Sequence, residues 1–312
     1  MAILLPLPPL GLGTGEVESF PSYFARLAEA HVLSPIKLMR LLVDRRLRDD
    51  PRSACPSETL LYSNKGIVLA GYTAGSDDFV SMVEKATGNS TLKQMTYSFL
   101  RQCGDPSHCD ALRESRAWCP ACLWESQKYD VPFYDRLLWA LKNIVRCPMH
   151  RLTLATRCPS CSYKQRYYNK SSNNTICWKC SASLATTSEK WMPELIPSLG
   201  EADCIGLTAA AAEMQQDYTV RNVFDVFIVE LNRKDPEKFL AVANILKKQR
   251  TKQSCPRNTI VTFDSMLKIA LLTSIPLAAI LSDPAGCVVC TRPFDRIGSP
   301  IGHFSTSPLM AI

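Results

Sequence analysis

Eight residues between positions 119 and 180 have the types and the spacing of metal ligands. They fall into four close pairs: Cys119/Cys122, Cys147/His150, Cys158/Cys161 and Cys177/Cys180. Zn²⁺ prefers four tetrahedral thiolate or imidazole ligands, and a two-residue gap lets one tight turn aim two ligands at one ion. The pattern therefore predicts two zinc ions per chain, each held by two pairs.

Neighbouring pairs give the simplest grouping, a Cys₃His site followed by a Cys₄ site, although an interleaved cross-brace stays open. Proline follows Cys119, Cys147 and Cys158, which is typical of a sharp turn after the first ligand, so we expect zinc knuckles. Two complete sets of four protein ligands predict structural zinc, because catalytic zinc keeps one position for water. Disulfides or scattered thiols fit four such pairs poorly.

The remaining cysteines are less regular. Cys287 and Cys290 form a fifth close pair with only His303 nearby, so half of a third site is an alternative to plain thiols. Five cysteines have no partner at ligand spacing and are predicted to be plain thiols: Cys55, Cys103, Cys109, Cys204 and Cys255. Fourteen cysteines without a recognisable signal sequence predict a reducing compartment, the cytoplasm, where cysteine pairs hold metal.

Composition predicts an ordinary globular protein. With 312 residues, of which 46% are hydrophobic, the chain has the size of two or three domains. The longest apolar run, Ile269 to Leu281, is too short to span a bilayer and is interrupted by Pro276, so we expect a buried helix and turn there and no contact with a membrane.

Positive charge is concentrated around the ligand pairs. The chain carries a formal charge of +7, and no Asp or Glu occurs from Arg136 to Ser188. Nine cations lie in that segment: Arg136, Lys142, Arg146, Arg151, Arg157, Lys164, Arg166, Lys170 and Lys179. Four aromatic residues interleave with them: Tyr163, Tyr167, Tyr168 and Trp178.

Cations that bind phosphates and rings that stack on bases together predict nucleic-acid contact. The candidate contacts in this block are Arg146, Arg151, Arg157, Lys164, Arg166, Tyr167, Lys170 and Lys179. The alternative is a solvated face around a small metal module, with the aromatic rings packed over the thiolates.

The segments before the ligand pairs are predicted to be helical. An apolar stripe from Phe20 to Ala28 predicts a helix that ends near Ala30, and Ser34 with Pro35 begins a second helix, giving a helix-turn-helix. Arginines on the second helix are candidate phosphate contacts, diluted by nearby aspartates: Arg40, Arg45, Arg46 and Arg48. A helix after Asp77 and Asp78 should end at Gly88.

Two further helices are expected in the first half. One begins at Ser90 and carries the apolar residues Leu92 to Leu100, and the other runs from Phe133 to Val145 into Cys147. The C-terminal third predicts helices from Val220 to Leu231, from Pro236 to Leu246, and around 266–272. A basic cluster closes the second of these, with Lys247, Lys248 and Arg250 as candidate nucleic-acid contacts, the alternative being compensation of the helix dipole.

Several segments together resemble the TniQ/TnsD family of transposon target-selection proteins. They are GEVESFPSYFARLAEAHVLSP, FVSMVEKATGNSTLKQMTYSFL, WCPACL, LLWALKNIVRCPMHRLTL, RCPSC and CWKCSASL, in order over about residues 5 to 185. The resemblance implies an N-terminal helix-turn-helix domain and two zinc fingers. With 312 residues the chain is nearer to the shorter TniQ proteins of CRISPR-associated transposons, which act in the prokaryotic cytoplasm and on the nucleoid.

The fold expected is mainly α with small zinc modules, divided into a helical domain (1–112), tandem zinc fingers (113–186) and a C-terminal helical domain (187–312). The resemblance implies a non-enzymatic adaptor that joins a target-bound CRISPR effector, with its guide RNA and target DNA, to an AAA+ ATPase regulator. No phosphate loop, HExxH or GxSxG motif occurs, so no catalytic residue is predicted.

Two other functions stay open: a guide-independent, sequence-specific DNA-binding selector, and a zinc hydrolase with an open ligand position. The C-terminal helices have two candidate uses, dimerisation to a homodimer or docking to the effector.

Overall fold

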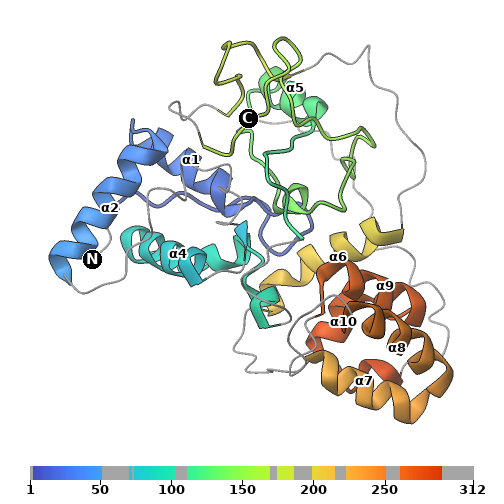
Figure 1. Cartoon of the computed structure of the whole chain (residues 1–312). Coiled ribbons are helices and arrows are strands. Elements are labelled where there is room, and N and C mark those ends of the chain that lie inside the picture. The colour runs from blue at the N-terminus through green and yellow to red at the C-terminus, as the bar shows by residue number, and fades with distance from the viewer. Residues whose placement is uncertain are drawn as a thin grey trace, which may run out of the picture.

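The computed structural model describes residues 3–50, 70–71, 74–102, 111–168, 174–185, 199–214, 223–250 and 261–289. Within these ranges the chain is helical, and its β contacts are isolated bridges rather than strands. Figure 1 shows α1, α2 and α4 on one side, a loop-rich region around α5 at the top, and the helices from α6 to α10 at the lower right. The predicted fold class, mainly α with cysteine-rich modules, is confirmed, and the three domain boundaries stay predictions.

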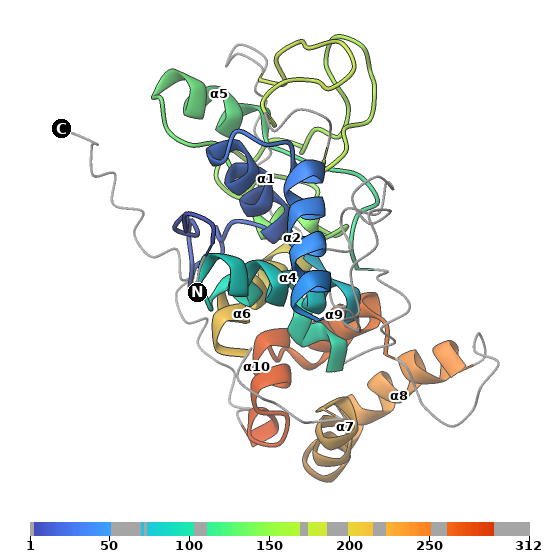
Figure 2. The same cartoon turned by 90° about the vertical axis from the view of Figure 1, so that its left-hand side faces the viewer.

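The first helix pair follows its capping residues. Helix α1 (Phe20–Ala30) begins after Ser19, whose hydroxyl accepts a hydrogen bond from the Ser22 N–H, and it ends where the sequence predicts. Helix α2 (Pro35–Asp49) is capped by Ser34 in the same way and has proline in its first turn. Four residues separate the two helices, and α2 packs on both α1 and α4; in Figure 2 it stands in front of α4 with α1 at its side.

Helix α4 (Ala74–Thr87) ends at Gly88, which has a φ of +73°, as predicted for a glycine after a helix. It begins three residues before Asp77, earlier than expected. Rings of Phe20, Phe24 and Phe79 meet edge to face between α1 and α4, with centroids 4.9 to 5.6 Å apart across the two helices. These rings form the centre of the N-terminal core.

The helix predicted after Ser90 is wrong. Two short 3₁₀ turns, η2 (Leu92–Met95) and η3 (Ser98–Gln102), occupy that segment. Side chains supply the hydrogen bonds that a helix would make: the Glu84 carboxylate accepts from the Leu92 N–H, and the Thr96 hydroxyl bonds the Lys93 carbonyl. The segment thereby brings Tyr97 inward, where its hydroxyl lies 2.8 Å from the Thr208 hydroxyl.

The helix predicted from Phe133 to Val145 is also wrong, because only η4 (Leu137–Ala140) is helical. Its flanks instead hydrogen-bond to distant backbone. The Leu137 N–H donates to the Val17 carbonyl at 2.8 Å, and the Lys142 N–H donates to the Ala111 carbonyl at 2.9 Å. The leucine and tryptophan side chains of η4 are all buried. This apolar run therefore packs into the core in several directions, whereas an amphipathic helix would bury only one face.

The described residues from 199 onward form six elements: α6 (Leu199–Met214), α7 (Val223–Lys234), α8 (Pro236–Arg250), α9 (Phe263–Thr273), α10 (Leu277–Ser282) and η6 (Cys287–Val289). The helices predicted around Val223, Pro236 and Met266 are confirmed, and Val220 lies outside the described residues. Pro276 separates α9 from α10 within the apolar run, as expected. Helix α6 was not predicted; it packs on α9, α10 and η4 and so joins the two halves of the chain.

In the described part of the chain, no helix combines the length and the apolar character needed to cross a membrane.

Candidate metal centres and the basic surface

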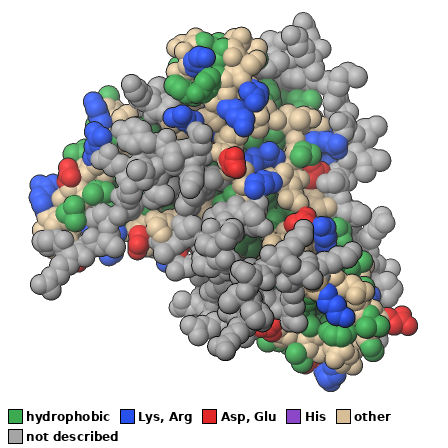
Figure 3. Space-filling view, viewed as in Figure 1, with side chains coloured by type: hydrophobic (Ala, Val, Ile, Leu, Met, Phe, Trp, Pro, Cys, Tyr) green, Lys and Arg blue, Asp and Glu red, His purple; other side chains and the backbone are tan. Residues whose placement is uncertain are grey.

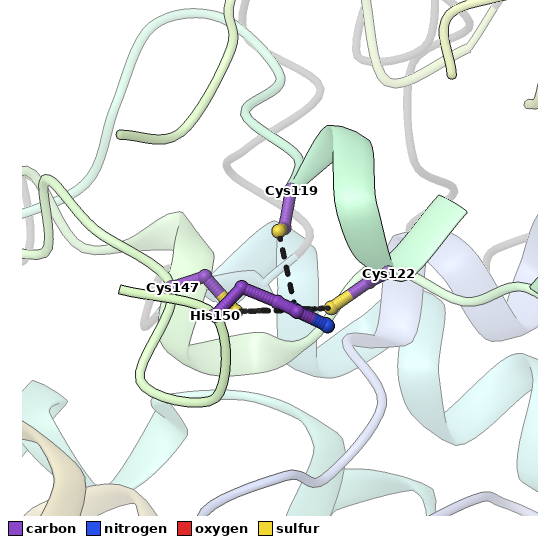
Figure 4. Close-up of side chains that lie close together, drawn as sticks. All are labelled: Cys119, Cys122, Cys147 and His150. Atoms are coloured by element: carbon purple, nitrogen blue, oxygen red, sulfur yellow. Dashed lines mark hydrogen bonds between the residues drawn. The ribbon is translucent and has the colours of Figure 1, made fainter. Parts of the chain in front are cut away.

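The first ligand set converges from two segments. Cys119 is the N-cap of α5 (Pro120–Lys128), Cys122 lies in its first turn, and Cys147 and His150 lie on the loop that follows η4. Figure 4 shows the four side chains pointing toward one another. Their ligand atoms all lie within 4.8 Å of one another. A helix N-terminus also favours negative charge, which suits two thiolates placed there.

The distances fit a tetrahedral ion. Metal–sulfur bonds of about 2.3 Å place two tetrahedral sulfurs about 3.8 Å apart, and the sulfurs of Cys122 and Cys147 are 3.7 Å apart. His150 Nδ1 lies 3.3 to 3.7 Å from the three sulfurs. Its Nε2 lies 3.0 Å from Glu125 Oε1, the carboxylate that commonly orients a metal-bound imidazole from the outer side.

The second ligand set has the same dimensions. Two sulfur pairs, Cys158 with Cys180 and Cys161 with Cys177, are each 3.7 Å apart. All four sulfurs lie within 4.8 Å of one another. Both sets therefore fit zinc-binding modules, and the predicted grouping of neighbouring pairs is confirmed over the interleaved alternative.

Three of the four pairs share one backbone turn, which begins at Cys147, Cys158 and Cys177. In each, the N–H of the first cysteine donates to the carbonyl five residues later, at 2.8 to 3.0 Å, and the N–H four residues later donates back at 2.8 to 2.9 Å. The residue four positions after the cysteine is left-handed in every case: Arg151, Ser162 and Ser181, with φ of 59°, 56° and 58°. The predicted knuckles are confirmed here.

The knuckle predicted at Cys119 is wrong, since Pro120 begins a helix there instead of a turn. Proline at the first helical position and proline in a knuckle look alike in sequence, because both follow an extended residue.

The members of the first set share protons through mutual hydrogen bonds. The hydrogen bonds from Cys119 and then Cys122 hold the pKa of Cys147 far below its ordinary value, whereas hydrogen bonds with Cys119 and Cys147 raise the pKa of Cys122. Contact with Cys119 and Cys147 raises the pKa of His150 to about 11. A bound metal ion replaces these shared protons, so metal binding at this set releases protons.

Arg136 lies against the first set. Its Nη1 donates to Cys122 Sγ at 3.0 Å, and its Nε donates to the Glu16 carboxylate. Burial lowers the pKa of Arg136, but the negative charges of Cys122 and Glu16 outweigh burial and raise it. With 11% of its side chain exposed, Arg136 is an inward charge partner of the thiolates, not part of the basic surface in which the sequence placed it.

The second set receives neutral donors. Gln165 Nε2 donates to Cys177 Sγ at 3.3 Å, and the backbone N–H groups of Ser160 and Lys179 donate to Cys158 and Cys177 at 3.4 Å. Burial opposes the ionisation of Cys177, but hydrogen bonds led by the backbone of Cys180 and Lys179 lower its pKa to about 6. Cys180 itself is exposed.

The predicted nucleic-acid contacts lie in different environments. Arg157, Lys164 and Lys179 are exposed, and Arg146, Arg151 and Arg166 are partly buried. Figure 3 shows basic side chains gathered on the upper part of this face, over the loop-rich region of Figure 1.

Tyr167 is packed in the interior: its side chain is 6% exposed, and burial raises the pKa of its hydroxyl, so its contact with nucleic acid stays a prediction. Lys247 is exposed on α8, whereas Lys170 and the side chains of Lys248 and Arg250 lie outside the described residues. On α2, Arg46 and Arg48 donate to the carbonyls of Asp78 and Asp44, so these two arginines have structural uses.

Of the cysteines outside the two ligand sets, the structure describes Cys204 and Cys287. Cys204 is a buried thiol in α6, as predicted, and Cys287 is buried in η6. Cys290 and His303 lie outside the described residues, as do Cys55, Cys103, Cys109 and Cys255, so the fifth pair stays untested.

Sequence reasoning missed the groups that surround the ligands. Glu125 follows Cys122 by three residues on α5, and this helical spacing was a signal that the two share a face. Arg116 and Asp135 form a buried ion pair at 2.6 Å, and Arg116 also donates to the Asn174 carbonyl at 2.7 Å. No local pattern indicated this pair, because its partners lie 19 residues apart.

The family model of TniQ matches residues 9–154, which contain α1, α2, α4, α5 and the whole first ligand set. No curated protein matches the chain. The second ligand set and the helices from α6 onward lie beyond the matched residues. Over residues 9–154, slightly less than half of the chain, the protein is therefore similar to the TniQ family.

Proposed function

We propose that the protein is a non-enzymatic adaptor of transposition target selection that joins a target-bound, RNA-guided CRISPR complex to an AAA+ ATPase regulator. The match of residues 9–154 to TniQ is the observation that carries the proposal. Proteins of this family are non-catalytic accessory factors of transposition. A role beside the transposase, rather than in its chemistry, follows for this chain.

Zinc is the ion that we propose for both ligand sets, two per chain. Thiolate and imidazole donors suit zinc, and four protein ligands at tetrahedral spacing make each site structural. Bound zinc would supply a cross-link between α5 and the loop at Cys147, and a second between two knuckles. Neither set reserves a position for water, which argues against a hydrolase.

The connection between the two halves suits an adaptor. The hydroxyls of Tyr97 and Thr208 lie 2.8 Å apart in a buried contact, and α6 also packs on η4. A partner bound to the C-terminal helices would therefore be held at a defined position relative to the TniQ region. Such rigidity is what a protein needs when it positions one complex against another.

Reconstitution tests the proposal. Tagged full-length protein is incubated with a purified AAA+ ATPase transposition regulator, with or without a CRISPR effector, guide RNA and target DNA, and retained ATPase is measured. We expect retention to require the effector and the matched target, while a guide with a scrambled spacer serves as the control. In parallel, the isolated protein is footprinted on DNA. A sharp footprint without guide RNA, together with effector-independent retention, would overturn the proposal in favour of a guide-independent selector.

A further inference from the structure

The second ligand set supports a pair of aromatic rings, Trp178 exposed and Tyr163 partly buried. The rings of Tyr163 and Trp178 lie edge to face with centroids 4.9 Å apart. Trp178 is 37% exposed, more than any other tryptophan in the described part of the chain. An aromatic ring that shielded the thiolates would be buried, as Trp118 and Trp139 are elsewhere in the structure. Trp178 therefore does little to enlarge the core of this module.

Cations flank both rings. The Arg166 guanidinium lies 5.3 Å from the centre of the Trp178 ring, and the Lys179 ammonium lies 4.9 Å from that of Tyr163. Beside them is an open pocket of about 330 Å³. Its lining brings in two more cations, Arg157 and Lys164, and one acid, Glu114. We call the surface formed by Arg157, Tyr163, Lys164, Arg166, Trp178 and Lys179 the knuckle face.

The positive charge of the knuckle face is not used to neutralise the metal site. Neutral groups donate to the sulfurs of the second set, whereas at the first set the cation Arg136 donates to a sulfur. Within the described part of the chain, none of the four cations of the knuckle face forms an ion pair. They are left available for an anion that comes from outside.

An exposed tryptophan ring beside cations that form no ion pair in the described part of the chain suits an unpaired nucleotide. Cations bind the phosphates of any nucleic acid, but a base stacks on a protein ring only when it is free of a duplex. We propose that the knuckle face binds single-stranded nucleic acid, with phosphates held by Arg157 and Lys164 and a base stacked at Trp178. The face lies outside residues 9–154. The proposal does not rest on the adaptor function, since it is argued from the rings and cations of this surface alone.

Binding of fluorescent oligonucleotides to the full-length, zinc-loaded protein tests this. A 12-nucleotide oligo-dT, an oligo-U of the same length and a 12-base-pair duplex are compared by anisotropy at several salt concentrations. We expect both single strands to bind more tightly than the duplex, and Trp178→Ala to weaken single-strand binding about tenfold. A difference between oligo-dT and oligo-U would tell whether DNA or RNA is preferred.

Trp124→Ala is the matched control. Trp124 on α5 also has a lysine over its ring, Lys128 at 4.8 Å, but it lies away from the knuckle face pocket. Trp178→Phe should restore most of the binding because it keeps a stacking ring. The double variant of Lys164→Gln and Arg166→Gln should lower the salt dependence of binding, whereas Lys142→Gln, an exposed lysine outside the face, should leave it nearly unchanged.

Zinc content separates binding from folding. Any variant that still carries two zinc ions reports on the surface alone, and if Trp178→Ala loses zinc, Trp178→Phe and the double variant still decide the question. The proposal fails if the duplex binds as tightly as the single strands. It also fails if Trp124→Ala weakens binding as much as Trp178→Ala, or if none of the oligonucleotides binds.

Discussion

The first ligand set lies inside the helical body, with ligands from α5 and an inward arginine that contacts both a sulfur and Glu16. The second set is built from two knuckles, its Cys180 is exposed, and its sulfurs accept from backbone and amide groups. The two sets have nearly the same ligands at the same distances. They differ in where the surrounding positive charge points, inward at the first and outward at the second.

The two ligand sets are alike, but the cations around them have different roles. A Cys₃His site with zinc carries one negative charge and a Cys₄ site carries two, so charge alone would place more cations against the second. The structure does the opposite. Charge compensation at the first set joins it to the N-terminal core, and the second set leaves its cations for contacts outside the chain.

Replacing one ligand in each set should give the largest difference in stability between the two sets. Cys147→Ser should release one zinc and destabilise the region of residues 9–154 by at least about 4 kcal/mol, because the metal there connects α5 to the core. Cys180→Ser should also release one zinc while most of the helix is retained. Zinc content and urea unfolding followed by circular dichroism measure both. Equal loss of helix in the two variants would contradict the comparison.

Replacing Arg136 should have the next largest effect on stability. Arg136→Gln leaves the Glu16 carboxylate and the Cys122 thiolate without their cation in a buried site, and should cost about 3 kcal/mol of unfolding free energy. Arg136→Lys should recover part of this. Arg166→Gln on the knuckle face is the matched control and should change stability little. Denaturant midpoints measure all three, and a similar loss in Arg166→Gln would show that the second set also depends on its cations.

Outer partners of the ligands should have smaller, local effects. Glu125→Gln weakens the acceptor at His150 Nε2 and should speed zinc loss from the first set about tenfold. Gln165→Met removes the amide that donates to Cys177 and should speed loss from the second set alone. Chelator competition with a colour indicator resolves the two rates. Acceleration of both sets by either variant would mean that the sites are coupled.

Tyr168→Phe should have the smallest effect. Tyr168 comes from the segment between the two knuckles of the second set, but its ring packs edge to face on Phe24 with centroids 6.0 Å apart. Its buried hydroxyl has no hydrogen-bond partner among the described residues. Removing that hydroxyl should change the unfolding free energy by less than about 0.5 kcal/mol. A loss of 2 kcal/mol or more in thermal or denaturant unfolding would reveal a hidden partner.

The ligand sets could be predicted because their signal is local. Three pairs use a turn that is complete within six residues, so spacing alone nearly determines the geometry. Capping serines and Gly88 defined helix ends for the same reason. The Phe133 to Val145 segment failed because its backbone partners, Val17 and Ala111, lie far away in sequence.

Burial was equally hard to infer. The apolar pattern of α6 has almost no preferred face, so periodicity gave no helix there, although the helix joins the two halves. Tyr167 and Trp178 have similar basic neighbours in sequence, yet one is buried and the other exposed. Arg136 belongs to the same basic block as Arg166 and faces the opposite way. Whether a residue is buried or exposed depends on long-range contacts that sequence spacing does not show.

The same backbone turn occurs at Cys147, Cys158 and Cys177, each time in different surroundings. Arg151, Ser162 and Ser181 occupy the same left-handed position in three copies of one turn, a conformation that costs a side-chain-bearing residue about 1 kcal/mol relative to glycine. A glycine at each of the three positions would remove the same local strain while the surroundings differ. Differences among the three variants would then measure only what each turn is attached to: the helical body at Arg151 and the outward module at Ser162 and Ser181.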